Sequence, residues 1–376
     1  MYLTNVKRKI LIASFLKPVN DIRAYEKMAV SIAKNNRYKV YCTGYPVNSE
    51  FNNDKIQLIS LKPFKRGMIS RVISRWKVFK LYIKLKPELI IVNSPDLLII
   101  TVLYKILFGG QICYDIRENY FRNLWYQNNY PIIIKHFLAI AVRTREIITS
   151  SLFDHFFLAE KVYVSQLSFI GSNYTLLENK SNQPITINDR QRIKKDPVFL
   201  ISGTLAEEYG LFKAVDFFKL ISSVFPKSRL KIIGHCPNAK TYSKLKSIVH
   251  NHAIIEVAAS KDPVPHDTII DAILTADFGL LPYLPNKSTS GKWPTKLYEY
   301  MAYHLPFIIQ TNPLWNTFIE QTNSGLLFDF TNFDRSSCKL ITDQLNNHPF
   351  YSNMLPPEIY WNDEEHRLLN VIEHLL

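Results

Sequence analysis

Two lysines and a glutamate stand close together in a segment that could bind a phosphorylated ligand. Lys296 follows Lys292 by four residues, and Glu299 lies one turn beyond Lys296 if the segment is helical. Cations at the start of a helix add to its positive end, where free backbone N–H groups can hold an anion. A carboxylate on the next turn could accept hydrogen bonds from sugar hydroxyl groups. The segment therefore predicts a site for a ligand that carries both phosphate and sugar.

The surrounding residues predict a strand, a polar loop, a helix and a second strand, in that order. The apolar run 278–281 ends at Pro282, which cannot donate a hydrogen bond to a neighbouring strand. Pro294 suits the first turn of a helix over residues 295–303, and Pro306 begins a second apolar run. The loop and the first helical turn hold the other predicted contacts to the ligand, which are Ser290, Gly291, Lys292 and Thr295.

The same segment carries a resemblance to a known family. Residues 294–329, PTKLYEYMAYHLPFIIQTNPLWNTFIEQTNSGLLFD, resemble the nucleotide-sugar signature of glycosyltransferases with two Rossmann-like domains, especially the retaining family 4. In that family, the glutamate at the place of Glu299 binds the ribose of the donor. A second acidic residue usually stands eight positions earlier, where this chain has Gly291. The resemblance is specific for the family, but it does not identify the donor sugar.

The leaving group of such a transfer is a nucleoside diphosphate, whose negative charge grows as the sugar departs. In the family, the loop after the first strand of the second domain commonly supplies an arginine and a lysine. Here those places are Thr204 and Tyr209. We therefore predict that Lys296 has the main catalytic role at the diphosphate, with Lys292 or Lys213 in support.

Two glycines at strand ends are further candidates for donor binding. Backbone N–H groups after Gly203 could hold phosphate, with Thr204 beside them. Gly234 resembles the family's glycine near the nucleotide, although an ordinary turn glycine explains it equally well. For Lys213 two roles remain equally open: it could contact the phosphate, or it could be an ordinary solvent-exposed lysine.

In the first half of the chain, charged residues follow two predicted strands. Asp21 and Arg23 come after the first strand, and we predict that they lie on the acceptor side of the site. The stretch YDIRENY matches a family segment near the reacting centre, with Arg117 where histidine usually stands. We predict Arg117, Asp115 and Glu118 as catalytic residues, with the two acids as candidates to handle the acceptor hydroxyl. Helix capping is an alternative role for Asp21 and for both of those acids.

A basic amphipathic helix is predicted within Phe64 to Lys86. Its apolar side chains include Trp76, and eight lysines and arginines surround them. Such a helix can lie on an anionic membrane surface, and the alternative is a core helix with a solvated basic face. We predict the membrane contact.

Composition sets limits on the class of protein. The 376 residues are 47% hydrophobic and have a net charge of +14, which favours phosphate-bearing substrates, anionic lipid or nucleic acid as partners. The cysteines have no metal-ligand or redox spacing, and we predict buried, reduced thiols. These are Cys42, Cys113, Cys236 and Cys338. Because the chain also starts without a leader-like segment, we expect a cytoplasmic protein, bound peripherally to the inner face of the membrane.

Strands and helices alternate along the chain, which predicts an α/β fold with parallel sheets. A polar stretch after residue 180 predicts a linker between two domains. We expect two Rossmann-like domains that face each other across a cleft, as the resemblance implies, with a final helix that returns to the first domain. The predicted divisions are residues 1–180 for an acceptor domain, 181–196 for a linker, 197–355 for a nucleotide-sugar domain and 356–376 for the final helix.

Asp96 is predicted to cap the helix that follows it.

These observations predict a glycosyltransferase of hexosyltransferase type that uses a nucleotide-diphosphate sugar. The resemblance implies retention of configuration, and we expect a glycan or lipid-linked acceptor in surface polysaccharide synthesis. No Asp-x-Asp motif is present, so neither a metal nor another cofactor is implied. The alternatives are an epimerase or phosphorylase of the same fold, or a basic nucleic-acid-binding protein. Against the last, the chain has no recognisable nucleic-acid-binding motif, and we expect no nucleic acid partner.

Overall fold

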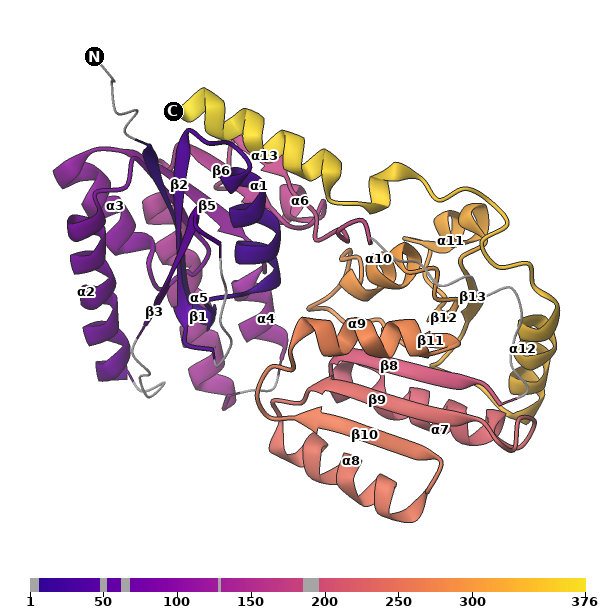
Figure 1. Ribbon diagram of the computed structural model, residues 1–376. Helices are drawn as coiled ribbons and strands as arrows, with labels where there is room; N and C mark the ends of the chain where they lie inside the picture. Colours follow the sequence, from indigo (N-terminus) through magenta and orange to yellow (C-terminus); the bar gives the residue numbers. More distant parts are fainter. Residues whose placement is uncertain (1–6, 48–52, 62–67, 128–129, 185–195) are drawn as a thin grey trace. The chain divides into compact units, whose positions relative to one another are not determined.

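The computed structural model describes residues 7–47, 53–61, 68–127, 130–184 and 196–376 (Figure 1). The chain divides into two compact units, the first made of Met1–Asn179 with Trp361–Leu376 and the second of Lys180–Tyr360. Each unit is a parallel sheet covered by helices, which confirms the predicted α/β fold with two Rossmann-like domains. Most of the predicted linker, residues 185–195, lies outside the described residues.

The sheet of the first unit runs in the order β3-β2-β1-β4-β5-β6-β7. Its strands are β1 (Arg8–Pro18), β2 (Tyr38–Tyr45), β3 (Ile56–Ser60), β4 (Leu89–Val92), β5 (Gln111–Ile116), β6 (His155–Leu158) and β7 (Tyr174–Leu176). The central residues of β1, β2, β4, β5 and β6 are buried, as in the run LIIV of β4, whereas the outer strands β3 and β7 are only partly buried. Continuous apolar runs of this kind are typical of parallel strands covered on both sides, and the sequence predicted a strand at each of these places.

Helices cover both faces of this sheet (Figure 1). They are the π-helical stretch η1 (Ile22–Ala29), α1 (Val30–Ala33), α2 (Met68–Leu85), α3 (Leu98–Phe108), α4 (Tyr120–Tyr126), α5 (Ile132–Ser150), α6 (Tyr163–Gln166) and α13 (Asn362–Leu375). Leu11 of β1 packs in the core formed with α2 and α3, whereas its neighbour Ile10 packs in the core formed with η1 and α13. Leu368 and Ile372 of α13 are fully buried there, so the predicted return of the last helix to the first domain is confirmed.

The sheet of the second unit runs in the order β10-β9-β8-β11-β12-β13. Its strands are β8 (Val198–Thr204), β9 (Arg229–His235), β10 (Ile255–Ser260), β11 (Phe278–Leu281), β12 (Phe307–Gln310) and β13 (Gly325–Phe328). Its helices are η2 (Glu207–Tyr209), α7 (Leu211–Ile221), α8 (Ala239–Asn251), α9 (His266–Thr275), α10 (Thr295–Ala302), α11 (Asn316–Thr322), α12 (Arg335–Asn347) and η3 (Pro357–Ile359). Phe199 and Leu200 of β8 point into separate cores on the two faces.

Two further expectations concern single residues. The prediction that Asp96 caps a helix is wrong: Leu97 precedes α3 without a side-chain cap, and the Asp96 carboxylate instead binds Arg71 and Arg75 of α2 at 2.6 and 2.5 Å. The cysteines are free and buried, as predicted. Among the described residues, no helix is long and apolar enough to cross a membrane.

Candidate functional site

The order of the strands in the second unit reverses beside its central strand. β8 lies between β9 and β11, so the segments that follow β8 and β11 leave the same edge of the sheet in different directions. Ligands of doubly wound sheets bind at such a position, beyond the carboxyl ends of the strands. β8 ends at Thr204, and the loop 282–294 leads from β11 into α10. The sheet therefore brings the predicted residues of both segments to one edge.

Lys296 of α10 lies directly against the end of β8. A Cβ atom added to Gly203 would be only 2.8 Å from Cε of Lys296, so the lysine side chain crosses the backbone of this glycine. Gly203 pairs with Gly234 of β9, where an added Cβ atom would be 1.8 Å from the Gly203 carbonyl oxygen. The two glycines therefore permit a close approach of Lys296 and the two strand ends that larger residues would prevent.

Glu299 is buried one turn farther along α10, between a lysine and a histidine. The Lys296 ammonium group donates a hydrogen bond to Oε2 of Glu299, and Nε2 of His266 lies 3.5 Å from Oε1. Burial alone would raise the pKa of Glu299, but the charge of Lys296 and the contact with His266 outweigh it and lower that pKa to about 2. Because the pKa is lowered, the ionised Glu299 stabilises the fold above the ordinary glutamate pKa, and this contribution is lost as the pH falls toward about 2.

Other contacts hold α10 and the loop before it in place. The hydroxyl groups of Tyr300 in α10 and Ser202 in β8 are 2.9 Å apart, which ties the helix to the central strand. In the loop, the side-chain oxygen of Asn286 accepts hydrogen bonds from the backbone N–H groups of Ser288 and Thr289, both at 3.0 Å. Local side-chain to backbone bonds of this kind fix a loop conformation without regular structure.

The other predicted residues of this loop lie beside the start of α10. Thr295 begins the helix, Lys292 is half-buried just before it, and Ser290 is exposed. Gly291 has a φ of +82°, a left-handed conformation that an acidic side chain would adopt only at a cost. The family's second acidic residue is therefore replaced here by a turn that favours glycine.

The contacts of Lys213 are to a different segment from those of Lys296. Its ammonium group lies 3.5 Å from the Thr331 carbonyl oxygen and over the ring of Phe333, both in the segment after β13. Thr204, by contrast, is exposed at the end of β8, next to Gly203. We therefore keep Thr204 in the candidate site and leave Lys213 out of it.

Replacement of Gly203 by alanine should displace Lys296 without unfolding the protein. The new methyl group would contact the flexible end of a lysine side chain, and a positive φ of 101° costs roughly 1–2 kcal/mol for a non-glycine residue. A misplaced catalytic group commonly costs on the order of 100-fold in rate, so turnover of Gly203→Ala should fall by about that factor. The matched control is Gly171→Ala, because Gly171 also has a positive φ but has no atom within 4 Å of an added Cβ. Equal turnover of the two variants would contradict the contact between Gly203 and Lys296.

In the first unit, four of the five residues predicted near the acceptor form one largely buried network. Arg23 donates to both oxygens of Asp115 at 2.7 to 3.1 Å, and Arg117 donates to Oδ2 of Asp115 at 3.0 Å. Arg117 also donates to Oδ1 of Asp21 at 2.6 Å, and Asp21 caps η1 through the Ala24 N–H group. Burial would raise the pKa of Asp21, but the nearby Arg117 and Lys17 lower it. Asp21 thus has both the predicted capping role and a charged partner.

The two arginines of this network differ in whether a guanidinium N–H group remains without a hydrogen-bond partner. Arg23 is 5% exposed, and it also donates to the Leu177 carbonyl and to the Asn179 side chain at 2.6 and 2.9 Å. Its guanidinium is therefore committed to holding β5 against the segment after β7. The buried Nη2 atom of Arg117, in contrast, has no hydrogen-bond partner among the described residues. Arg117 is the member of the network that retains a donor for a ligand.

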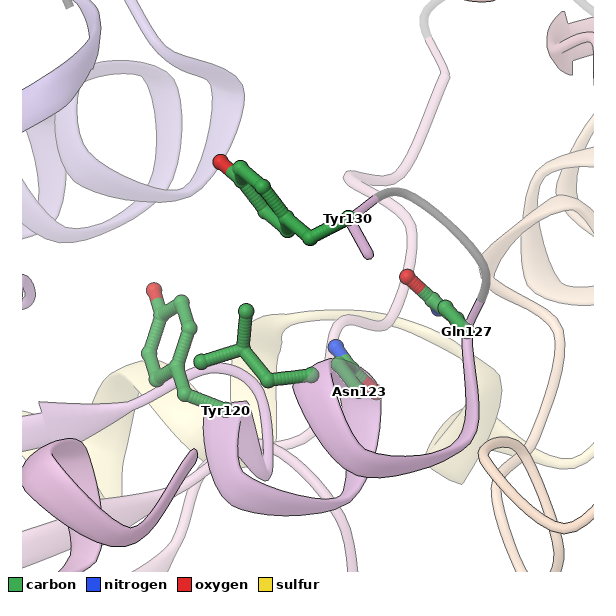
Figure 2. Close-up of a pocket in the computed structure, with 5 residues that line it drawn as sticks. Tyr120, Asn123, Gln127 and Tyr130 are labelled. Atoms are coloured by element: carbon green, nitrogen blue, oxygen red, sulfur yellow. The ribbon is translucent and has the colours of Figure 1, made fainter. Parts of the chain in front are cut away.

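Glu118 lies outside this network and contacts Asn123, a residue that lines a pocket on α4. Its carboxylate accepts a hydrogen bond from Asn123 at 3.0 Å, while Asn119 is the residue that caps α4. Neither Asp115 nor Glu118 is a helix cap, which removes that alternative for both acids. Figure 2 shows the pocket, with Asn123 on α4 below Tyr130. Its lining is formed by Tyr120, Asn123, Leu124, Gln127 and Tyr130.

The loss of Arg23 should destabilise the protein strongly. Arg23→Ala would leave the fully buried Asp115 with one cation in place of two, and breaking a buried ion pair typically costs about 3–5 kcal/mol. The matched control is Arg37→Ala, because Arg37 pairs with Glu373 on the surface of the same unit, and such pairs contribute about 0–1 kcal/mol. Denaturant unfolding of both variants measures the difference. A loss for Arg23→Ala no larger than that of the control would show that the network does not hold the fold.

Sequence reasoning did not identify His266 as a member of the candidate site. It begins α9, after a polar loop, and 33 positions separate it from Glu299 in the sequence. No local pattern marks a histidine of this kind, because its role comes from the packing of two helices on one face of the sheet.

Comparison with known proteins finds one family model that matches most of the second unit. The family model described as "Glycosyl transferases group 1" matches residues 182–354, which lie within the second unit. No curated protein matches the chain in sequence.

Solved structures match the fold of nearly the whole chain. Sucrose-phosphate synthase from Thermosynechococcus elongatus matches with a TM-score of 0.71 at 12% identity, over 98% of this chain and 99% of that one. HepE from Anabaena, solved with UDP and glucose, matches with a TM-score of 0.65 at 10% identity, over 97% and 99%. WaaG, a glycosyltransferase involved in lipopolysaccharide biosynthesis, matches with a TM-score of 0.62 at 10% identity, over 96% and 95%. At these identities the likeness shows the fold. This chain therefore has the GT-B fold of two Rossmann-like domains, and most of its second unit matches the model of the group 1 glycosyl transferases.

Proposed function

We propose that the chain is an enzyme that transfers a hexose-type sugar from a nucleotide-diphosphate donor to an acceptor hydroxyl, with retention of configuration. The observation that carries this proposal is the cluster at the edge of the second sheet, where Lys296 crosses Gly203 and binds Glu299. This cluster combines a cation and a carboxylate with two glycines at the ends of neighbouring strands, which suits a ligand with both phosphate and sugar groups.

Each group of the cluster has a role in the proposed reaction. Departure of the nucleoside diphosphate builds negative charge, which the Lys296 ammonium and the N–H groups at the start of α10 can stabilise. Glu299 remains ionised because its pKa is about 2, and its two oxygens have acceptor sites beyond those that Lys296 and His266 use. Those remaining sites suit the two hydroxyl groups of a ribose.

The first unit is the proposed place of acceptor binding. The free Nη2 atom of Arg117 and the Glu118 carboxylate beside Asn123 offer one donor and one acceptor for a sugar hydroxyl. The tyrosine and amide side chains that line the pocket of Figure 2 suit a glycan as well. We propose that this glycan is a lipid-linked precursor of a surface polysaccharide, used at the cytoplasmic face of the membrane. The net charge of +14 supports this, because such acceptors and membranes carry negative charge.

A thermal-shift screen of the whole chain tests the donor class. Nucleoside diphosphates and nucleotide sugars with different bases should be compared with matched nucleosides and free sugars. A ligand that binds the folded state raises the melting temperature by mass action, so one base should stabilise the protein as its diphosphate and as its nucleotide sugar. No shift with any diphosphate, or return of an epimerised donor when it is incubated with the protein, would contradict the proposal.

We expect activity to survive removal of divalent metal. The diphosphate charge is assigned here to Lys296 and to backbone N–H groups, so turnover in EDTA should equal turnover in buffer with magnesium. The check is release of nucleoside diphosphate from the donor that the screen identifies. Loss of activity in EDTA with recovery in magnesium or manganese would assign the charge to a metal ion instead.

A further inference from the structure

The first unit exposes an unusual amount of apolar surface on three adjacent helices. Of the 22 large apolar side chains that are exposed among the described residues, 14 lie on α2, α3 and α5, whereas only four lie in the second unit. A contiguous apolar surface of this kind usually marks a contact with a partner or with a membrane. We call it the α2–α3–α5 face.

The face is continuous because α3 packs against both α2 and α5. Along α5 the exposed side chains recur at helical spacing, and Ile133 is 81% and Phe137 71% exposed. On α2 the exposed apolar side chains include Trp76. The exposed members of the face are Val72, Ile73, Trp76, Ile99, Ile106, Leu107, Phe108, Ile132, Ile133, Ile134, Phe137, Ile140, Ile147 and Ile148.

The charges on these helices are almost all positive. They carry nine lysines and arginines and a single acidic residue, Glu146, which is buried and accepts a hydrogen bond from Tyr114. Lys77, Lys80 and Lys84 are exposed on α2, on the same helix as Trp76. An apolar face with basic side chains and an exposed tryptophan is suited to the head-group region of an anionic bilayer.

The same charges argue against a second copy of the chain as the occupant. A two-fold contact through this face would bring the cations of one copy near those of the other, and lysine is depleted in the centre of protein interfaces. We therefore propose that the α2–α3–α5 face docks on an anionic lipid membrane, with apolar side chains of α5 inserted among the lipids and the lysines of α2 at the phosphates. The predicted basic helix is then one part of a wider surface. This proposal deepens the proposed function, on which it rests only for the source of the acceptor.

Flotation with vesicles tests the docking surface without any sugar transfer. The whole chain should float with vesicles that contain phosphatidylglycerol, less so at high salt, and should not float with pure phosphatidylcholine. Ile133→Ser with Phe137→Ser should lower partitioning by roughly tenfold or more, because two large apolar side chains are lost. Lys77→Gln with Lys80→Gln and Lys84→Gln should lower binding to the anionic vesicles and weaken its salt dependence.

The second unit supplies a matched control. Leu340 is 67% and Met354 95% exposed there, so Leu340→Ser with Met354→Ser removes a similar amount of exposed apolar surface away from the face. This control should float like the parent, and all variants should melt like it. Failure of the parent to float, or parental flotation of the Ile133 and Phe137 variant, would overturn the proposal. The proposal would also be overturned if the parent did not bind vesicles but formed a dimer that these substitutions dissociate. Nucleotide binding is measured separately by thermal shift, so failure of docking and failure of the proposed transferase function are distinguishable.

Discussion

Lys296→Ala should lower turnover at saturating donor by roughly two orders of magnitude or more, which is the usual cost of losing a prearranged transition-state donor. The ammonium group lies at the edge of the second sheet, across Gly203 and in contact with Glu299. From this position it can stabilise the diphosphate charge that develops as the sugar leaves. Lys296→Arg keeps the charge and should therefore retain more activity than the alanine variant.

The chain supplies a matched control in Lys213. This lysine also belongs to a helix of the second unit, but its ammonium group contacts Thr331 and Phe333. Lys213→Ala should keep parental turnover. Because Lys296 is the partner of a buried carboxylate, each variant must melt near the parent before its rate is interpreted. A folded Lys296→Ala protein with unchanged turnover would show that another group neutralises the leaving diphosphate.

Glu299→Ala should weaken nucleoside-diphosphate binding by about 10- to 100-fold. A hydrogen bond to a charged group contributes about 1.5–3 kcal/mol, and the carboxylate is proposed to hold ribose hydroxyl groups. Glu299 is 5% exposed and ionised, so its removal also leaves Lys296 and His266 without their shared partner. We expect the affinity for the nucleoside to fall together with that for the diphosphate, because both carry the ribose.

The control for Glu299 is an exposed glutamate on another helix of the same unit. Glu320→Ala on α11 should bind nucleotide like the parent. Calorimetric titration of the three proteins gives the dissociation constants. An unchanged affinity of a folded Glu299→Ala protein would remove this residue from the binding site.

The sequence predicted features that depend on neighbouring residues. Buried parallel strands are continuous apolar runs, so β4 and β11 were evident, and the stripe of α13 marked its buried face. The sequence also predicted that Lys296 and Glu299 lie on one helix, whereas their ion pair is a finding of the structure.

Features that depend on distant residues could not be predicted. Arg23 and Asp115 are 92 positions apart, and only the fold shows that Asp115 is shared by two arginines. Asp96 was expected to cap α3 because it stands just before that helix. Its actual partners, Arg71 and Arg75, belong to another helix and could not be inferred from neighbouring residues. The orientation of Lys213 depends on how α7 packs, which periodicity alone does not set at a helix start.

A crystal structure of the whole chain with the nucleoside diphosphate chosen by the thermal-shift screen would locate the donor site. We expect ribose hydroxyl groups within hydrogen-bond distance of the Glu299 carboxylate. We also expect diphosphate oxygens near Lys296 Nζ and the backbone N–H groups after Gly203. A nucleotide that binds elsewhere in either unit and does not contact Glu299 or Lys296 would contradict the proposed donor site.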